Sequence, residues 1–360
     1  MTFGARALIR LDALKHNLSV IRKACPGAKI MAVVKANAYG HGMVPVAQSI
    51  PEVDSFAVAR LAEAIQLRQA GVVTPIVLLA GVFNNEELQQ VIANNFEIVV
   101  HCQEQIALLE AAQGGAAIVW LKFDTGMNRL GFNPDDAEDL LARLNDCDAV
   151  AELRLMSHLA SADDRGNADT AAQLDRFNEL VAGFDGAVSI ANSAGALAWP
   201  ALGGDVWIRP GLLLFGLSPF DDQTGVDLDL HPVMQFEARL IAVKPLAKGS
   251  LVGYRGRYKA PEDSTIGIIS AGYGDGYTRH FKTGTPVLIN GRRVPLIGNV
   301  SMDMIAVDLG PNAEDQVGDV ATLWGDGLPI EEVAPWAGAI PYDLVCGVMN
   351  REASEIVDQG

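Results

Sequence analysis

Short apolar runs alternate with amphipathic stretches over the first two-thirds of the chain, and this alternation strongly restricts the folds open to it. Continuous apolar runs are typical of parallel strands, because helices cover both faces of a parallel sheet. Eight such strands within about 230 residues predict a (β/α)8 barrel, with a doubly wound sheet as the alternative. The runs are KIMAVVK, SFAVA, PIVLLA, FEIVV, AIVWLKF, ELRLMSH, AVSIAN and VWIRPGLLLFG. We expect Asp12 to cap the first helix, with Leu14, Leu18 and Ile21 on its buried face.

After His231 the pattern changes to β-prone runs separated by Gly, Pro and Asp turns, which predicts a second, mostly β domain. These runs are MQFEARLIAV, STIGIISA, TPVLING, RVPLIG, MIAVDL and DVATLW. The opening ALIRL alternates like a strand. We therefore expect an N-terminal strand in residues 1–10 that packs with the C-terminal domain, a barrel over 11–230 and a β domain over 231–360.

The chain has 360 residues, and its 27 basic and 44 acidic side chains leave a formal net charge of −17. Such a charge argues against nucleic acid and anionic membrane surfaces as partners. The four cysteines lie far apart and no pair has CxxC spacing, which favours reduced thiols and predicts no metal site. The first residues lack the apolar run of a signal peptide, and no apolar stretch is long enough to span a bilayer. We expect a cytoplasmic protein.

Polar side chains gather where the predicted barrel strands end, which is where barrel enzymes place their functional groups. Lys35 is delivered by an apolar strand into a turn of small residues, and desolvation there would make its amine a nucleophile. Taken alone, each of these residues could equally be an ordinary surface or core group. Only their occurrence together at the same end of the predicted barrel favours a functional site. The residues at the strand ends are Lys35, Lys122, Asp124, His158, Asn192 and Ser193, and Arg209 lies in the eighth strand.

Several motifs together resemble those of the alanine racemase family, in the family order and over essentially the whole chain. AVVKANAYGHG resembles the family's cofactor-binding motif, and the segments containing RPG and SMD are specific in combination with it. The others are LKFDTGMNRLGF, MSHLASAD, ANSAGAL, VGYRGRY, GYGDGY and PYDLV. The resemblance implies an isomerase that interconverts L- and D-alanine with pyridoxal 5′-phosphate, and a role in supplying D-alanine for the bacterial cell wall or in breaking it down.

The resemblance implies two catalytic bases on opposite faces of the substrate Cα, because one must remove the proton while the other returns a proton from the far side. Lys35 would carry pyridoxal phosphate as a Schiff base and act on one face. Tyr254 would act on the other face, activated by its surroundings.

The same resemblance implies a binding role for most of the remaining polar residues. Arg209 would face the pyridine nitrogen and keep it unprotonated, whereas many pyridoxal enzymes place an acid there. His158 would pack beside the ring with Asn192 nearby. The phosphate would be held by Ser193, the backbone near Gly211 and Leu212, and the hydroxyls of Tyr39 and Tyr342.

Substrate contacts are implied on both domains. Arg129 would approach the substrate carboxylate, oriented by a possible carbamate on Lys122, although Lys122 could instead pair with Asp124. Met302 and Asp303 would reach the substrate from the SMD segment, and Tyr273 and Arg279 resemble residues of the entry channel. Three departures from the family pattern bear on specificity, and they are Asn128, Arg255 and Arg257.

The resemblance also implies a homodimer in which Lys35 and Tyr254 of opposite subunits meet. Three other functions stay open at this point. One is a racemase for serine or a broader set of amino acids, and a second is a pyridoxal-dependent decarboxylase, which usually places an acid where Arg209 stands. The third is a non-catalytic pyridoxal-phosphate carrier, which would resemble the barrel alone.

Overall fold

The structure is a computed structural model that describes residues 4–199, 206–348, 351 and 354–357. The chain divides into two compact units. One takes in residues 18–38 and 43–214, and the other takes in residues 1–17, 39–42 and 215–360. No helix among the described residues is both long and apolar enough to cross a membrane.

The first unit contains a closed parallel barrel, so the predicted barrel is confirmed and the open doubly wound sheet is excluded. Its strands pair in the order β8-β7-β6-β5-β4-β3-β2-β9, and a parallel bridge between Val188 and Val206 closes the ring. The strands are β2 Lys29–Val33, β3 Ser55–Val58, β4 Ile76–Leu78, β5 Glu97–Val100, β6 Ala117–Lys122, β7 Val150–Met156, β8 Val188–Ser189 and β9 Trp207–Ile208.

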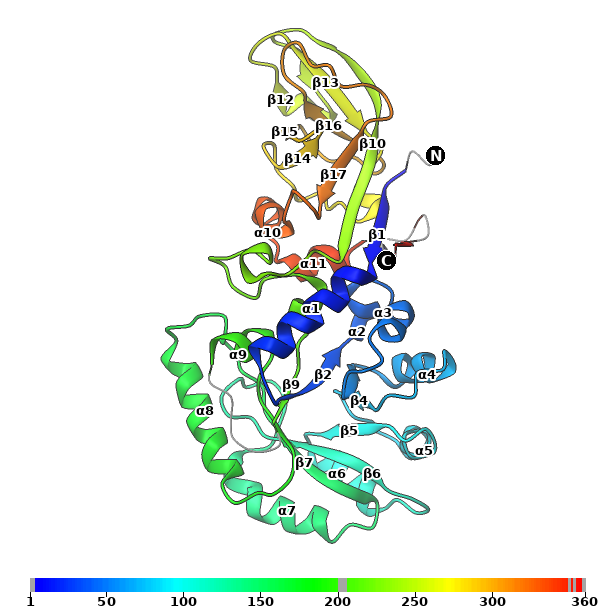
Figure 1. Ribbon diagram of the computed structural model, residues 1–360, viewed down its shortest axis with the longest axis vertical. Helices are drawn as coiled ribbons and strands as arrows, with labels where there is room; N and C mark the ends of the chain where they lie inside the picture. The colour runs from blue at the N-terminus through cyan, green and yellow to red at the C-terminus, as the bar shows by residue number, and fades with distance from the viewer. Residues whose placement is uncertain (1–3, 200–205, 349–350, 352–353, 358–360) are drawn as a thin grey trace. The chain divides into compact units, whose positions relative to one another are not determined.

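Helices alternate with these strands, and α4, α5, α7 and α8 lie outside the ring in Figure 1. The helices are α1 Leu11–Ala24, α2 Lys35–Tyr39, α3 Met43–Ser49, α4 Leu61–Gln69, α5 Asn85–Ala93, α6 Gln103–Glu110, α7 Ala137–Asn145, α8 Ala168–Val181 and α9 Ser193–Ala198. Leu14, Leu18 and Ile21 of α1 are buried as predicted. The predicted cap at Asp12 is wrong, because α1 already begins at Leu11 and Asp12 lies inside its first turn.

Several barrel strands are shorter than the apolar runs that predicted them, and two of these differences affect the site. β2 ends at Val33, so Lys35 follows the strand and opens the next turn. β9 ends at Ile208, and residues 212–215 form the 3-10 helix η2 Leu212–Phe215. Pro210 cannot donate a ladder hydrogen bond, which explains the early end of β9. Arg209 therefore stands just beyond its strand.

A mostly buried ion pair joins β5 and β7. Arg154 Nη1 is 3.1 Å from Glu97 Oε2, and Trp120 Nε1 donates to the same oxygen at 2.7 Å. The Arg154 guanidinium also stacks on Trp120 and Trp207, 5.3 Å from each ring. Burial raises the pKa of the Glu97 carboxyl, and the positive charge of Arg154 opposes this rise. Removing one partner would therefore leave the other charge buried without a counter-charge, which lowers the stability of the protein.

The second unit is mostly antiparallel β-structure, as the sequence predicted for the C-terminal part of the chain. Its main sheet has the order β13-β16-β15-β14-β17-β10-β1-β18, and β10 also pairs with β13. β1 (Arg6–Arg10) pairs antiparallel with β10, with Ala7 opposite Phe236. The other strands are β10 Met234–Leu246, β11 Leu251–Val252, β12 Tyr258–Lys259, β13 Ser264–Ile269, β14 Pro286–Ile289, β15 Arg292–Ile297, β16 Ile305–Asp308, β17 Val320–Trp324 and β18 Glu355–Val357.

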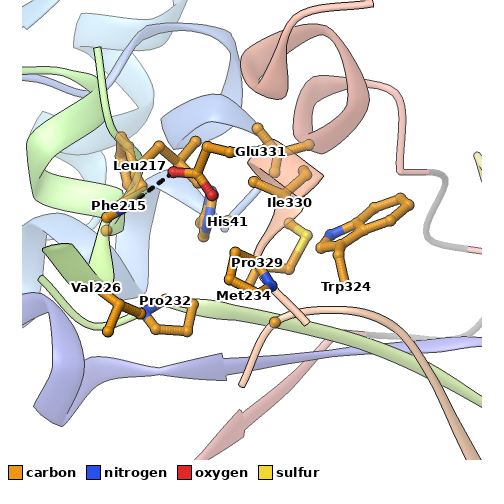
Figure 2. A pocket seen from close by; sticks show the side chains of 14 residues that line it. His41, Phe215, Leu217, Val226, Pro232, Met234, Trp324, Pro329, Ile330 and Glu331 are labelled. Atoms are coloured by element: carbon orange, nitrogen blue, oxygen red, sulfur yellow. Dashed lines mark hydrogen bonds between the residues drawn. The ribbon is translucent and has the colours of Figure 1, made fainter. Parts of the chain in front are cut away.

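Two short helices of this unit, α10 Ile330–Val333 and α11 Pro341–Cys346, were not predicted. Glu331 of α10 accepts backbone hydrogen bonds from Ser218 at 2.8 Å and Gly225 at 3.1 Å, which holds the chain after η2 in place. Figure 2 shows its carboxylate at the edge of a largely apolar pocket that includes Met234 and Trp324. None of the predicted site residues lines this pocket, so we assign it a structural role.

Candidate active site

Five of the predicted site residues, four basic side chains and one neutral histidine, form one cluster at the carboxyl ends of the barrel strands. Burial lowers the pKa of Lys122 to about 8, and the positive charges of Arg209, Arg129 and Lys35 add to the effect. The same groups lower the pKa of His158 to about 2, again with burial as the first cause. Such mutual shifts require the charges to lie close together. The barrel therefore brings Lys35, Lys122, Arg129, His158 and Arg209 to one mouth.

Arg209 is the most rigidly held member of this cluster. Its side chain is buried and donates to the Ser157 carbonyl at 2.7 Å, to the Ser189 hydroxyl and to Nδ1 of His158 at 3.0 Å. Burial lowers the pKa of Arg209 to about 9, which still leaves it charged at neutral pH. Because a guanidinium only donates, Nδ1 of His158 must accept, and the neutral imidazole carries its proton on Nε2.

The chain leaves Lys35 through a left-handed turn. Ala36, Asn37, Ala38 and Tyr39 all have φ of 53° or 54°, so α2 is not an ordinary right-handed helix. This conformation is unfavourable for residues with a Cβ and persists only where surrounding contacts hold it. Two such contacts are present, since Glu63 Oε1 accepts from the Ala36 N–H and Asn37 Oδ1 accepts from the Met43 N–H. Sequence reasoning missed this turn because KANAY contains no glycine, and its one residue that tolerates the left-handed region is Asn37.

The predicted phosphate-binding residues of the barrel also lie side by side. The Gly211 N–H donates to Ser193 Oγ at 3.0 Å, and Leu212 opens η2 directly afterwards. Asn192 is the N-cap of α9, with its Oδ1 accepting from the Gly195 N–H at 2.9 Å. These donors lie after β8 and β9, where barrels commonly hold a phosphate group.

The remaining predicted residues lie in the β unit. Burial raises the pKa of Tyr39, and nearby Cys346 and Tyr342 raise it further, which places these three groups together. Tyr254 is 71% exposed, in the 3-10 turn η4 Tyr254–Gly256, and its carbonyl accepts from Asn299 Nδ2 at 3.1 Å.

The GYGDGY and SMD segments are joined by backbone hydrogen bonds. Tyr273 N–H donates to the Ser301 carbonyl at 3.0 Å, and Gly274 N–H donates to the Met302 carbonyl at 2.8 Å. The Arg279 guanidinium lies over the Tyr273 ring, 6.0 Å from its centroid. Met302 is 53% exposed, and its segment is therefore presented on the surface of this unit.

Several residues that support these groups were missed. Asp303 binds Arg351 at 2.7 Å, and Arg351 also reaches the mostly buried Asp275 at 3.3 Å. No sequence signal links these three positions. Ser157, by contrast, directly precedes His158 and Ser189 ends β8, and their placement at strand ends was a usable signal.

A closed parallel barrel with a cluster of cationic side chains at its strand ends, followed in the chain by a mostly antiparallel unit, defines a class of two-unit barrel enzymes. Residues 9–219 match the family model for the alanine racemase N-terminal domain, and residues 233–356 match the model for the C-terminal domain. The chain belongs to the alanine racemase family.

Individual relatives match over nearly their full length. The alanine racemase of Vibrio atlanticus is 48% identical over 98% of this chain and 99% of that protein. The alanine racemase of Vibrio cholerae is 49% identical over 97% of both. Among solved structures, the biosynthetic alanine racemase of Pseudomonas aeruginosa covers all of both chains with a TM-score of 0.94 and 39% identity. The alanine racemase of Acinetobacter baumannii has a TM-score of 0.91 and 36% identity, covering 99% of this chain and all of that one.

Proposed function

We propose that this protein racemises alanine with pyridoxal 5′-phosphate as its cofactor. The observation that carries the proposal is full-length membership of the alanine racemase family in a chain whose barrel gathers Lys35, Arg129 and Arg209 at one mouth. The match to the C-terminal family domain favours a racemase over a carrier that resembles the barrel alone. A permanent cation at Arg209 favours it over a decarboxylase with an acid at that position.

The barrel residues fit the proposed cofactor chemically. Ser193 Oγ and the Gly211 N–H form a small polar cradle for a phosphate, and Arg209 and His158 provide polar contacts for a ring. The backbone near Leu212 and the hydroxyls of Tyr39 and Tyr342 would add phosphate contacts, with Asn192 as a nearby polar contact. Pyridoxal phosphate held by these residues would supply the electron-withdrawing system that makes the substrate Cα–H acidic.

The chain's own residues then move one proton on each face of the substrate Cα. We assign this transfer to Lys35 Nζ on one face and to Tyr254 Oη on the other. Arg209 cannot act as an acid near neutral pH, so it would hold the ring nitrogen unprotonated. The guanidinium of Arg129 and the backbone of Met302 would orient the substrate carboxylate, while Asp303, Tyr273 and Arg279 would shape the approach to it.

Lys122 is suited to carry a carbamate that orients Arg129. The pKa of its amine is lowered to about 8, so a larger fraction of the amine is neutral near neutral pH than in an ordinary lysine. A carbamate would also replace an ammonium that Arg129 and Arg209 repel with an anion that they attract. Pairing of Lys122 with Asp124 is the competing interpretation. The Asp124 carboxylate accepts backbone hydrogen bonds from its own loop, which favours the carbamate.

The racemase assignment is tested by following the optical rotation of L-alanine incubated with protein and cofactor. We expect the rotation to fall toward zero with wild type and to persist with Lys35→Ala. Parallel rates on serine and larger amino acids measure specificity. Equal or faster turnover of serine would refute the assignment to alanine, and absence of α-proton exchange with solvent would refute catalysis.

We also propose a cytoplasmic homodimer in which Lys35 of one subunit works with Tyr254 of its partner. A two-fold dimer is the commonest assembly, and the four free cysteines suit a reducing compartment. Mixing Lys35→Ala chains with Tyr254→Phe chains should restore up to one good site per mixed dimer. No recovery despite proven subunit exchange would contradict shared sites.

A further inference from the structure

The loop that carries Arg129 is closed on itself. Asp124 N–H donates to the Phe132 carbonyl at 2.8 Å, and Phe132 N–H donates to the Lys122 carbonyl at 2.9 Å. Gly131, with φ of 130°, allows this closure, since a Cβ there would lie 2.6 Å from the Asp124 nitrogen. Residues 124–132 therefore form a compact loop after β6, and Arg129 is one of the residues between its two ends.

The Asp124 carboxylate organises this loop from its base. Oδ1 accepts from the N–H groups of Gly126 at 2.9 Å and Asn128 at 3.0 Å, and Oδ2 accepts from the N–H of Arg129 at 3.1 Å. Hydrogen bonds from backbone N–H groups to a carboxylate are charge-assisted and stronger than neutral ones. Burial would raise the pKa of Asp124, but these donors outweigh it and lower the pKa, so the carboxylate stays ionised at neutral pH.

The loop is also tied to its neighbours in the barrel. The Thr125 and Ser157 hydroxyls are 2.9 Å apart and buried, and Arg176 of α8 donates to the Thr125 carbonyl at 2.8 Å. These contacts fix the base of the loop, whereas Arg129 itself is exposed. Its charge nevertheless lowers the pKa of Lys122 and Arg209, so its guanidinium lies near the cluster.

We infer that Asp124 is a positioning residue for Arg129: it holds the backbone from which the Arg129 guanidinium meets the substrate carboxylate. This inference rests on the substrate-binding role of Arg129 in the proposed function. Asn128 lies in the left-handed region with φ of 56°, which is an unfavourable conformation. The Asp124 carboxylate stabilises it by accepting hydrogen bonds from the N–H groups of Asn128 and Arg129. Asp124 contributes by fixing one backbone geometry before substrate arrives.

The test is the Asp124→Asn variant, which keeps the shape of the side chain and removes its charge and one acceptor. We expect the KM for L-alanine to rise about tenfold, because one charge-assisted hydrogen bond is lost. We expect kcat to stay within about twofold of the wild-type value. KM does not depend on the fraction of enzyme that is folded, so partial unfolding would not mimic this result. Asp164→Asn is the matched control, because Asp164 Oδ1 accepts from the Gly166 N–H in a similar but exposed turn. Its KM should not change.

The Arg129→Lys variant distinguishes positioning from a general structural role. If Asp124 acts through Arg129, the double variant should have a KM close to that of Arg129→Lys alone, because the two effects are not additive. Multiplication of the two effects, or a fall in kcat at unchanged KM in Asp124→Asn, would overturn the inference.

A readout without turnover separates this inference from the proposed function. Amide hydrogen exchange at Arg129 should accelerate in Asp124→Asn and stay slow in Asp164→Asn, in the cofactor-loaded protein. Unchanged exchange would overturn the inference. If Arg129→Lys leaves KM unchanged while exchange still accelerates in Asp124→Asn, the substrate role of Arg129 fails and the positioning of its backbone stands.

Discussion

The amine of Lys122 should titrate near pH 8 and take up carbon dioxide. Its side chain is buried, with 7% of the residue exposed, and its pKa of about 8 compares with an ordinary value of about 10.5. At pH 7 about one amine in ten is then neutral, against about one in three thousand for an ordinary lysine. Only the neutral amine attacks carbon dioxide, so this environment favours carbamate formation about 300-fold.

The assay is carbon-13 NMR of the protein equilibrated with labelled carbon dioxide at fixed concentration between pH 6 and 8. We expect a carbamate carbonyl signal that grows as the neutral amine becomes more abundant, that is absent in Lys122→Met and that persists in Lys29→Met. Lys29 is a suitable control because it opens β2 and its Nζ stacks on Trp207, 5.2 Å from the ring. A signal that survives in Lys122→Met would refute the reasoning.

The same shift predicts how stability depends on pH. The pKa of Lys122 is lower in the folded protein than in the unfolded chain, so between about pH 8 and 10.5 the unfolded chain binds more protons. The cost of the buried charge, about 3 kcal/mol, is present below pH 8 and disappears as the pH rises. In buffer free of carbon dioxide, Lys122→Met should therefore unfold at higher urea concentration than wild type at pH 7. A less stable variant would contradict the buried-cation argument.

Two further predictions concern residues away from the cluster. Arg154→Met leaves the Glu97 carboxylate buried without its counter-charge and should lower the free energy of unfolding by about 3 kcal/mol in urea denaturation. Adding Glu97→Gln should recover most of this loss, and failure to recover would mean that the lost stacking of Arg154 on the tryptophan rings dominates. As a control, removing the exposed ion pair in Arg293→Ala should cost less than about 1 kcal/mol. Gly272→Ala should raise KM for alanine, because its Cβ would lie 2.3 Å from the Met302 carbonyl oxygen and displace that segment. An unchanged KM would show that Met302 does not approach substrate.

Much of the fold could be predicted because burial leaves a local pattern in the sequence. All eight barrel runs and all six later β runs contain strands, since apolar periodicity is set by which faces are buried. The ends of elements were less predictable. β9 stops at Ile208 although the apolar run continues, and Asp12 lies within α1 instead of capping it. Apolar character continues across a change of backbone conformation, so it cannot mark these ends.

The candidate site divides in a similar way. The positions of Lys35, Lys122 and His158 at strand ends follow from the strand pattern alone, whereas Arg209 was expected inside its strand. The left-handed turn after Lys35 does not, because its residues have no local preference for it and it depends on distant groups such as Glu63. The roles of these residues in catalysis stay predictions that rest on the family.

The amino-acid sequence by itself determined that polar residues would follow buried strands in a fixed order, because hydrophobic burial is encoded residue by residue along the chain. Only the tertiary structure decided which of those residues interact. Burial and the charge of Arg209, which follows a strand far along the chain, lower the pKa of Lys122, and the ion pairs of Arg351 need Asp275 and Asp303. Electrostatic and hydrogen-bond energies depend on distance and burial, and neither exists until separate segments pack together.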